Sequence, residues 1–268
     1  MNARQQDIEH LLQAGATLKV ADLARRFWVS GMTIRRDLDA LESAGRLART
    51  HGGAVLSRAG VIEFAFAEAG RRHAAEKRAI AGAVAAEIRP GMTVSLDTGT
   101  TTLEVARAMA GLRNVKVLTA SLAAASVLYA HADVELVLLG GTARRGSPDL
   151  TGPLTEENLG RFRVDLAVLG ADALAPDGVY TTDVGVSRVC RAMAAHARRA
   201  IVAADSSKIG HTAFYRIAGW SDFHELVTDA GVPAPARKWL AKIGCRVQYV
   251  PVPAPGTSGA TPQKGQPR

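Results

Sequence analysis

The sequence FWVSGMTIRRDLDALESAGRLARTHGGA, residues Phe27–Ala54, decides how the N-terminal part of this chain folds. Ile34, Leu38 and Leu41 recur at spacings of four and three, a pattern that predicts a helix with one buried stripe. Ser30 precedes that helix and is its predicted N-cap, because a serine hydroxyl accepts a hydrogen bond from the free amides of a first helical turn. The stretch therefore predicts a capped amphipathic helix with a defined buried face.

The exposed face of this helix carries arginine. At about 100° per residue, Arg36 points away from the buried stripe, and Thr33 and Arg35 lie on its flanks. Exposed arginines commonly pair with nearby carboxylates, and Asp37 or Asp39 would serve here. The alternative partner is DNA, because arginine donates two parallel hydrogen bonds to guanine. The elements on either side of the helix favour DNA.

Those elements complete a small DNA-binding head. Helices are predicted over Arg4–Ala14 and Val20–Arg26, and Gly45 is the predicted stop of the central helix. Arg46–Val55, with two glycines at its turn, is the predicted wing hairpin. A winged helix-turn-helix places its second helix in the major groove of DNA. The residues predicted to contact bases or phosphates are Arg25, Arg26, Ser30, Thr33, Arg35, Arg36, Arg46, Arg49 and His51.

The pattern changes beyond the head. An alanine-rich amphipathic helix is predicted over Glu76–Ile88, and short apolar runs then recur with helical stretches between many of them. These predicted strands are Thr93–Asp97, Val115–Thr119, Glu135–Gly140, Asp165–Gly170, Ala200–Asp205, Glu225–Asp229 and Arg246–Val250. Strands that are apolar on both faces indicate a mainly parallel sheet in an α/β domain. The predicted organisation is a winged helix-turn-helix at 1–57, a linker at 58–75, an α/β effector-sensing domain at 76–250 and a disordered tail at 251–268.

Polar groups gather where the predicted strands end. DTGTTT at 97–102 lies between a strand and a helix, where backbone amides, hydroxyls and the helix dipole favour a phosphate. GADA at 170–173 adds a carboxylate, and DSSK at 205–208 adds a carboxylate, two hydroxyls and a cation. LLGG at 138–141 allows close backbone approach. Arg144–Arg145 beyond it could bind an anion or be solvated, and solvation is expected. Lysine suits phosphate and aspartate suits sugar hydroxyls, so the inventory predicts a phosphorylated polyol site.

The run VSGMTIRRDLDALESAGRLARTHGGA, residues 29–54, resembles the N-terminal signature of the DeoR-type family of bacterial transcriptional regulators. DTGTTT, LLGG, Gly152, GADA, Gly178 and DSSK follow in the order of that family's sensor domain. The resemblance implies a sensor similar to ribose-5-phosphate isomerase, phosphorylated sugars or related metabolites as effectors, and repression as the function. The effector-binding roles that it implies fall on Asp97, Gly99, Thr100, Thr101, Thr102, Asp172, Asp205 and Lys208.

Two positions depart from the family pattern. Gly31 stands in the first turn of the central helix, where the family usually has an acidic or polar residue, so the operator sequence is not transferable from relatives. Ala120 stands where the family commonly has asparagine, which removes an amide donor and acceptor from the effector region.

Composition bounds the class of protein. The net charge of +8 and the pI near 9.9 make polyanions natural partners, and no apolar run reaches the length of a membrane span. Cys190 and Cys245 lie far apart and no histidine has metal-ligand spacing, so neither a metal nor a cofactor is expected. The expected partners are double-stranded operator DNA, a small phosphorylated effector and a second copy of the chain, with no membrane, and the expected location is the cytoplasm.

An enzyme is the competing hypothesis. A sugar-phosphate isomerase needs a carboxylate base, and the isomerase family carries a catalytic glutamate in the glycine-rich stretch after the GAD segment. Here that stretch, Gly178–Met193, contains no glutamate, so binding is expected and catalysis is not. A purely architectural DNA-binding protein would leave the large α/β region without a role.

Overall fold

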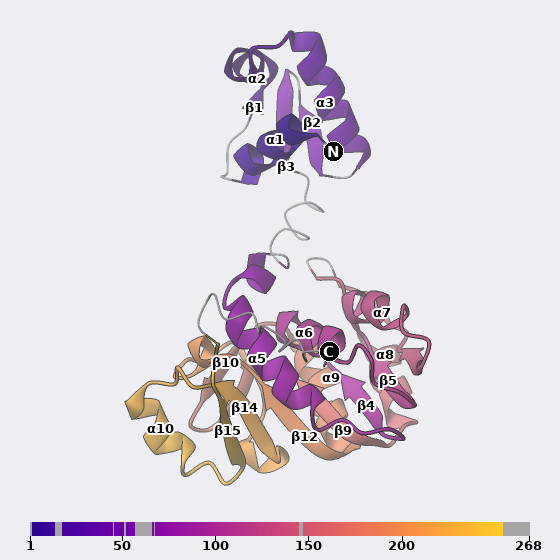
Figure 1. Ribbon diagram of the computed structural model, residues 1–268, viewed down its shortest axis with the longest axis vertical. Helices are drawn as coiled ribbons and strands as arrows, with labels where there is room; N and C mark the ends of the chain where they lie inside the picture. Colours follow the sequence, from indigo (N-terminus) through magenta and orange to yellow (C-terminus); the bar gives the residue numbers. More distant parts are fainter. Residues whose placement is uncertain are drawn as a thin grey trace, which may run out of the picture. The chain divides into compact units, whose positions relative to one another are not determined.

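The computed structural model describes residues 2–13, 18–44, 46–50, 52–56, 66, 68–144 and 147–253. The chain divides into two compact units (Figure 1). The head unit comprises Met1–Arg72 and Thr142–Leu150, and the sensor unit comprises His73–Gly141 and Thr151–Arg268.

The head unit folds as the sequence predicts. Its elements are α1 (Ala3–Gln13), β1 (Leu18–Lys19), α2 (Val20–Phe27), α3 (Gly31–Ser43), β2 (Leu47–Thr50) and β3 (Gly53–Leu56). The antiparallel β2–β3 hairpin pairs Leu47 with Leu56, and β1 adds to its β3 side. The buried stripe of α3 packs in one core with residues of α1, α2 and the hairpin, which are Ile8, Leu12, Val20, Leu23, Leu47 and Ala54. The predicted winged helix-turn-helix is confirmed in its helices and its hairpin.

A buried carboxylate ties α1 to α3. Asp37 is 5% exposed, and its Oδ2 accepts a hydrogen bond from Arg4 Nε at 2.6 Å. Its Oδ1 accepts from Gln5 Nε2 at 3.1 Å. Asp37 therefore orients α1 against α3, the predicted DNA-recognition helix. It is not the partner of Arg35 or Arg36.

The sensor unit contains a doubly wound sheet. Its strands in chain order are β4 (Thr93–Leu96), β5 (Val115–Thr119), β6 (Val134–Leu138), β9 (Val164–Leu169), β12 (Ala197–Ala203), β14 (Glu225–Asp229) and β15 (Arg246–Val250). Within the described residues, all of these strands are parallel, in the order β15-β14-β12-β9-β4-β5-β6. From β4 the chain adds β5 and β6 on one side. It then crosses to the other side of β4, where β9, β12, β14 and β15 follow in order. The carboxyl ends of β4 and β9 therefore form the switch point where open α/β sheets bind ligands.

Helices cover both faces of the sheet. They are α5 (Ala74–Ala85), α6 (Thr100–Ala108), α7 (Leu122–Leu128), α8 (Pro153–Gly160), α9 (Val184–Ala195) and α10 (Ala234–Leu240). α5 lies across the front of the sheet in Figure 1 and packs on α6, β12 and β14. Right-handed crossovers place α6 and α7 on that same face and α9, which follows the reversal of strand order, on the other. The main core lies between α5, α6 and the sheet, around Ile80, Val84, Val105, Leu166 and Ile201.

The predicted α/β fold class and its parallel strands are confirmed, with ends that shift by a few residues. Two smaller sheets were not predicted. One is the antiparallel sheet of β10 (Ala173–Ala175), β11 (Gly178–Thr181) and β13 (Tyr215–Ala218), and the other is the short pair of β7 (Thr142–Ala143) and β8 (Leu150–Thr151). Gly45, most of the predicted linker and the tail from 254 onward lie outside the described residues, so the domain boundaries stay predictions. In the part of the chain that is described, no helix has both the length and the apolar character needed to cross a bilayer.

Asp37→Ala should loosen the head, because the donors of Arg4 and Gln5 lose a buried acceptor. We expect α3 amides to exchange hydrogen about ten-fold faster, the effect of losing one charge-assisted hydrogen bond. Mass-spectrometric hydrogen exchange on the full chain measures this, with exposed Asp7→Ala as the control variant. Unchanged exchange in Asp37→Ala would show that apolar packing alone holds α1 against α3.

Candidate functional site

The first turn of α3 is organised by Ser30. Its Oγ accepts a hydrogen bond from Thr33 N at 3.2 Å and lies 3.0 Å from Thr33 Oγ1. This cap confirms the predicted start of the helix, and it holds both hydroxyls together at the end of α3 that a helix-turn-helix presents to DNA.

The two arginines of α3 are both exposed. Asp37 faces the other way, into α1, so it does not neutralise them. Arg36 makes no ion pair with any residue that the structure describes. The exposed side of α3 therefore offers at least one arginine to an external acceptor.

The remaining predicted DNA contacts differ in their surroundings. Arg25 is exposed and pairs with exposed Asp22 at 2.5 Å, a contact of the kind that screening makes weak. Arg26 is exposed and borders a hollow with Asp7 and His10 of α1.

The wing shows less of its predicted chemistry. Arg46 pairs with Glu9 of α1 at 3.3 Å, so its head group contributes to the packing of the head. The side chain of Arg49 and all of His51 lie outside the described residues.

In the sensor unit, the DTGTTT loop begins a helix. Gly99 is the N-cap of α6 with φ of +148°, a conformation that side chains other than glycine's rarely adopt. No side chain caps this end, and first-turn amides have no acceptor inside a helix. Thr100 and Thr101 are half-buried beside these amides, whereas Thr102 is fully buried and donates its hydroxyl to Gly99 O at 3.1 Å. Thr102 thus holds the loop, whereas Thr100 and Thr101 keep part of their surface exposed beside the amides.

Asp97 joins the two central strands at the switch point. It is 3% exposed, its amide donates to Val168 O at 3.0 Å, and its Oδ2 accepts from Gly170 N at 2.9 Å. Asp97 therefore fixes the backbone of both strand ends next to the α6 N-terminus.

The DSSK loop adds buried charge. Asp205 is 1% exposed, and its Oδ1 accepts from the amide and the hydroxyl of Ser207. Its Oδ2 is buried and accepts no hydrogen bond from the described residues. Asp229 holds the loop from β14, accepting from Ser206 N at 2.6 Å and Gly231 N at 2.9 Å. Lys208 is half-buried at the end of this loop.

Lys77 is a candidate that the sequence analysis missed. It lies in the first turn of α5 and is only 4% exposed. Burial lowers the pKa of its ammonium, while Asp205 and Glu104 of α6 favour the charged form and Lys208 opposes it. Lys77 is therefore in electrostatic contact with both the DSSK loop and α6. Its position in the first turn of an amphipathic helix was visible in the sequence, but its burial against the loop was not.

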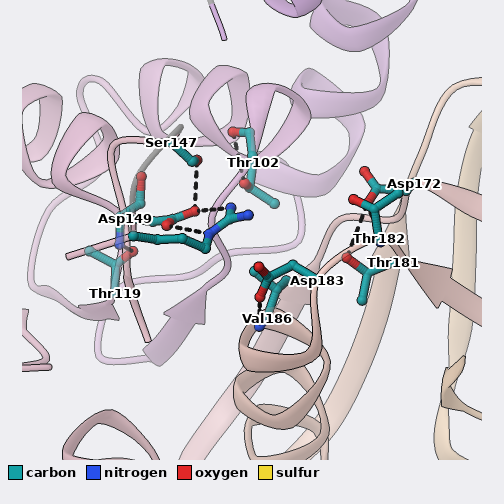
Figure 2. Close-up of polar contacts among 12 residues, drawn as sticks. Thr102, Thr119, Ser147, Asp149, Asp172, Thr181, Thr182, Asp183 and Val186 are labelled. Atoms are coloured by element: carbon teal, nitrogen blue, oxygen red, sulfur yellow. Dashed lines mark hydrogen bonds and ion pairs between the residues drawn. The ribbon is translucent and has the colours of Figure 1, made fainter. Parts of the chain in front are cut away.

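Asp172 is exposed and already hydrogen-bonded within its own hairpin. Its Oδ2 accepts from the hydroxyls of Thr181 and Thr182 at 3.0 and 2.9 Å and from Thr182 N at 2.8 Å (Figure 2). These contacts fix the carboxylate in place at the end of β11 and leave Oδ1 for other partners.

The turn after β5 has its own internal bonds. Thr119 Oγ1 donates to Leu96 O at 2.7 Å and accepts from Ser121 N, and Ser121 caps α7 through Ala124 N. Ala120 between them is buried. This turn is therefore held by side chains on both sides of Ala120.

Arg144 is paired, and the expectation that it is solvated was wrong, whereas Arg145 lies outside the described residues. Arg144 Nε and Nη2 donate to Asp149 at 2.9 and 2.6 Å, and Ser147 donates to the same carboxylate at 2.7 Å (Figure 2). Asp149 is 1% exposed, so the fold buries an acceptor that the sequence did not mark as buried.

Among the described residues, no group of three or more His, Cys, Asp or Glu side chains is placed to hold a metal ion. The two described cysteines are free thiols.

Family models match both units. A DeoR-like helix-turn-helix domain matches residues 4–59, and a DeoR C-terminal sensor domain matches residues 72–230. The chain belongs to the DeoR family of transcriptional regulators. The competing hypothesis of a sugar-phosphate isomerase is not supported, because the family and its relatives are transcriptional regulators and not enzymes.

Several curated relatives of this DeoR-family regulator are named as repressors. The transcriptional repressor AccR of Agrobacterium fabrum is 37% identical over 85% of this chain and 89% of its own. The repressor CsqR of Escherichia coli K12 is 32% identical, covering 89% and 92%. The glycerol-3-phosphate regulon repressor of the same strain is 31% identical, covering 86% and 91%. Ribose 5-phosphate isomerase A from Neisseria gonorrhoeae aligns at 16% identity and a TM-score of 0.37 over 50% of this chain and 52% of its own, a likeness too low to support any conclusion.

Gly99→Ala should distort the α6 N-terminus, because alanine at φ of +148° is strained. We expect a loss of about 1–3 kcal/mol in the free energy of unfolding of the sensor unit. Gly82→Ala is the matched control: Gly82 lies in α5 with open space around it, and alanine there should stabilise by about 0.5–1 kcal/mol. Denaturant unfolding of both variants measures the difference, and equal stabilities would show that the loop tolerates another conformation.

Proposed function

We propose that this regulator is a repressor that leaves its operator when a small phosphorylated sugar or polyol binds the carboxyl edge of the sensor sheet. The observation that carries the proposal is the charge gathered at this edge. Buried Lys77 interacts electrostatically with both the DSSK loop and α6. The N-terminus of α6 has amides that no side chain caps. Two lysines and a helix N-terminus suit a phosphate group.

Carboxylates at the same edge suit the rest of such a ligand. Asp205 keeps one buried oxygen without a hydrogen bond from the described residues, and sugar hydroxyls are donors that an aspartate accepts. We assign ligand contacts to Gly99, Thr100, Thr101, Asp205, Lys208 and Lys77, with Asp97, Thr102 and Asp172 shaping the site through their own hydrogen bonds. The name of the glycerol-3-phosphate regulon repressor, a relative, supports a phosphorylated polyol as the ligand class.

On the DNA side we assign base contact to Arg36, with Arg35, Ser30 and Thr33 beside it. Arg25, Arg26, Arg46, Arg49 and His51 are assigned to the phosphate backbone. A small head makes few base contacts, so pairing of two heads would raise affinity and specificity. We therefore propose a homo-oligomer acting in the cytoplasm.

The mechanism is thermodynamic linkage. An effector that binds one arrangement of the protein more tightly shifts the population between operator-competent and incompetent states. A coupling of about 1–3 kcal/mol is enough to change operator occupancy many-fold.

Arg36→Ala should lose discrimination between operator and random DNA by about 1–3 kcal/mol, because the arginine is assigned to a base. Binding of the full chain to a duplex from upstream of its own gene, against a random duplex at fixed salt, measures this. Arg26→Ala is the control, and it should weaken both duplexes equally. If Arg36→Ala also weakens both equally, Arg36 contacts phosphate.

Lys77→Met and Lys208→Ala should keep DNA binding and lose release by effector. A panel of sugar and polyol phosphates, with inorganic phosphate as a further probe, tests this on the same operator duplex. Lys238→Met, an exposed position in α10, is the control and should respond like the native chain. A normal response by either site variant would remove that lysine from the site.

Lys77→Met should not lower stability at neutral pH, because burial already disfavours the charged ammonium. At pH values between the lowered pKa of Lys77 in the fold and its ordinary value of 10.5, Lys77 binds fewer protons in the native state than in the unfolded chain. The native free energy of unfolding should therefore rise with pH in that window, and this part of the rise should vanish in Lys77→Met. A variant that is clearly less stable would mean that Lys77 is held by a stabilising ion pair.

A further inference from the structure

Trp28 occupies a backbone position that suits glycine. It follows α2 with φ of +53° and ψ of +42°, the left-handed region. Val29 N donates to Ala24 O at 3.1 Å and Trp28 N lies 3.4 Å from Arg25 O, the bonding of a helix-ending turn. Such turns favour glycine or asparagine, because a Cβ in this conformation is crowded by the backbone.

The indole gains nothing from the head to offset this strain. Its neighbours Phe27 and Val29 pack against the head core, whereas Trp28 is 93% exposed. A bulky residue held in a strained conformation with its side chain in solvent indicates a function for that side chain.

The surroundings of Trp28 indicate which partner it has. Met32, in the first turn of α3, is 61% exposed, so two large apolar side chains flank the capped start of the recognition helix. Exposed Arg36 lies one turn further along the helix face that carries Met32. A second copy of this surface would bring like charges together, whereas DNA complements them.

DNA offers one apolar group on its base edges in the major groove, the C5 methyl of thymine. We propose that Trp28, together with Met32, packs on thymine methyl groups of the operator and is a specificity-determining residue beside the bases that Arg36 reads. This inference rests on the proposed function, because it requires that the head binds a specific operator.

The test begins with duplexes that the full chain selects from random DNA. Affinity is then measured by fluorescence anisotropy at fixed salt for a selected site, for the same site with uracil in place of thymine, and for a random duplex. Uracil retains every hydrogen-bonding group of thymine and lacks only the methyl, so it isolates the apolar contact.

Trp28→Gly is the decisive variant, because glycine suits φ of +53° and should leave the fold intact or more stable. We expect about ten-fold weaker binding to the selected site, the size of one misread base pair, and little change on random DNA. Uracil should weaken the native chain similarly and Trp28→Gly clearly less, because both changes remove the contact of Trp28 and only that of Met32 remains. Phe214→Ala, which removes an exposed ring of the sensor unit, is the control and should match the native chain.

Several outcomes would overturn the inference. Unchanged affinity of Trp28→Gly for the selected site would remove Trp28 from the interface, and equal weakening on both duplexes would make it a backbone contact. Full sensitivity of Trp28→Gly to uracil would mean that another residue reads the methyl groups. If light scattering gave Trp28→Gly a lower oligomeric mass than the native chain, the partner of Trp28 would be a second copy of the chain. If the native protein enriches no sequence at all, the proposed function fails together with the inference.

Discussion

Asp97 is the contact on which the sensor site depends. Its backbone amide and its carboxylate both bond to the end of β9, so one residue closes the two central strands at the point where the strand order reverses. The backbone that leaves β4 must then turn directly into α6, and Gly99 makes that turn possible. The uncapped amides of α6 therefore point out from a rigid sheet edge rather than from a loop free to reorganise.

Charge buried at this edge gives the sensor its chemistry. Lys77 and Asp205 are both almost wholly removed from water, where their interaction is stronger than at a surface but where each also loses hydration. Such groups do little for stability by themselves. In the proposed complex, the hydroxyls of a sugar or polyol would donate to the Asp205 oxygen that accepts no hydrogen bond from the described residues.

The head is built with the opposite arrangement. Its buried carboxylate Asp37 is satisfied by α1 and orients α3 from behind. The front of that helix keeps arginine, hydroxyl and large apolar side chains in solvent. A rigid support behind and exposed polar and apolar side chains in front let a surface read DNA with little reorganisation of its own.

The sequence by itself determined the local structure. The period of Ile34, Leu38 and Leu41, the Ser30 cap and the continuous apolar strands follow from spacing and residue type, and all of them appear in the structure. It also marked DTGTTT and DSSK, because polar residues at strand ends cluster whenever strands are parallel.

Only the tertiary structure decided which of those groups are buried or already engaged within the fold. It buried Thr102, engaged Asp172 within its hairpin, paired Arg46 with Glu9 and placed Lys77 against residues more than a hundred positions away. It also left Trp28 exposed beside two neighbours that pack inward. Sequence patterns report the period of one element, whereas burial and pairing depend on which distant element packs against it, and that is a property of the assembled fold.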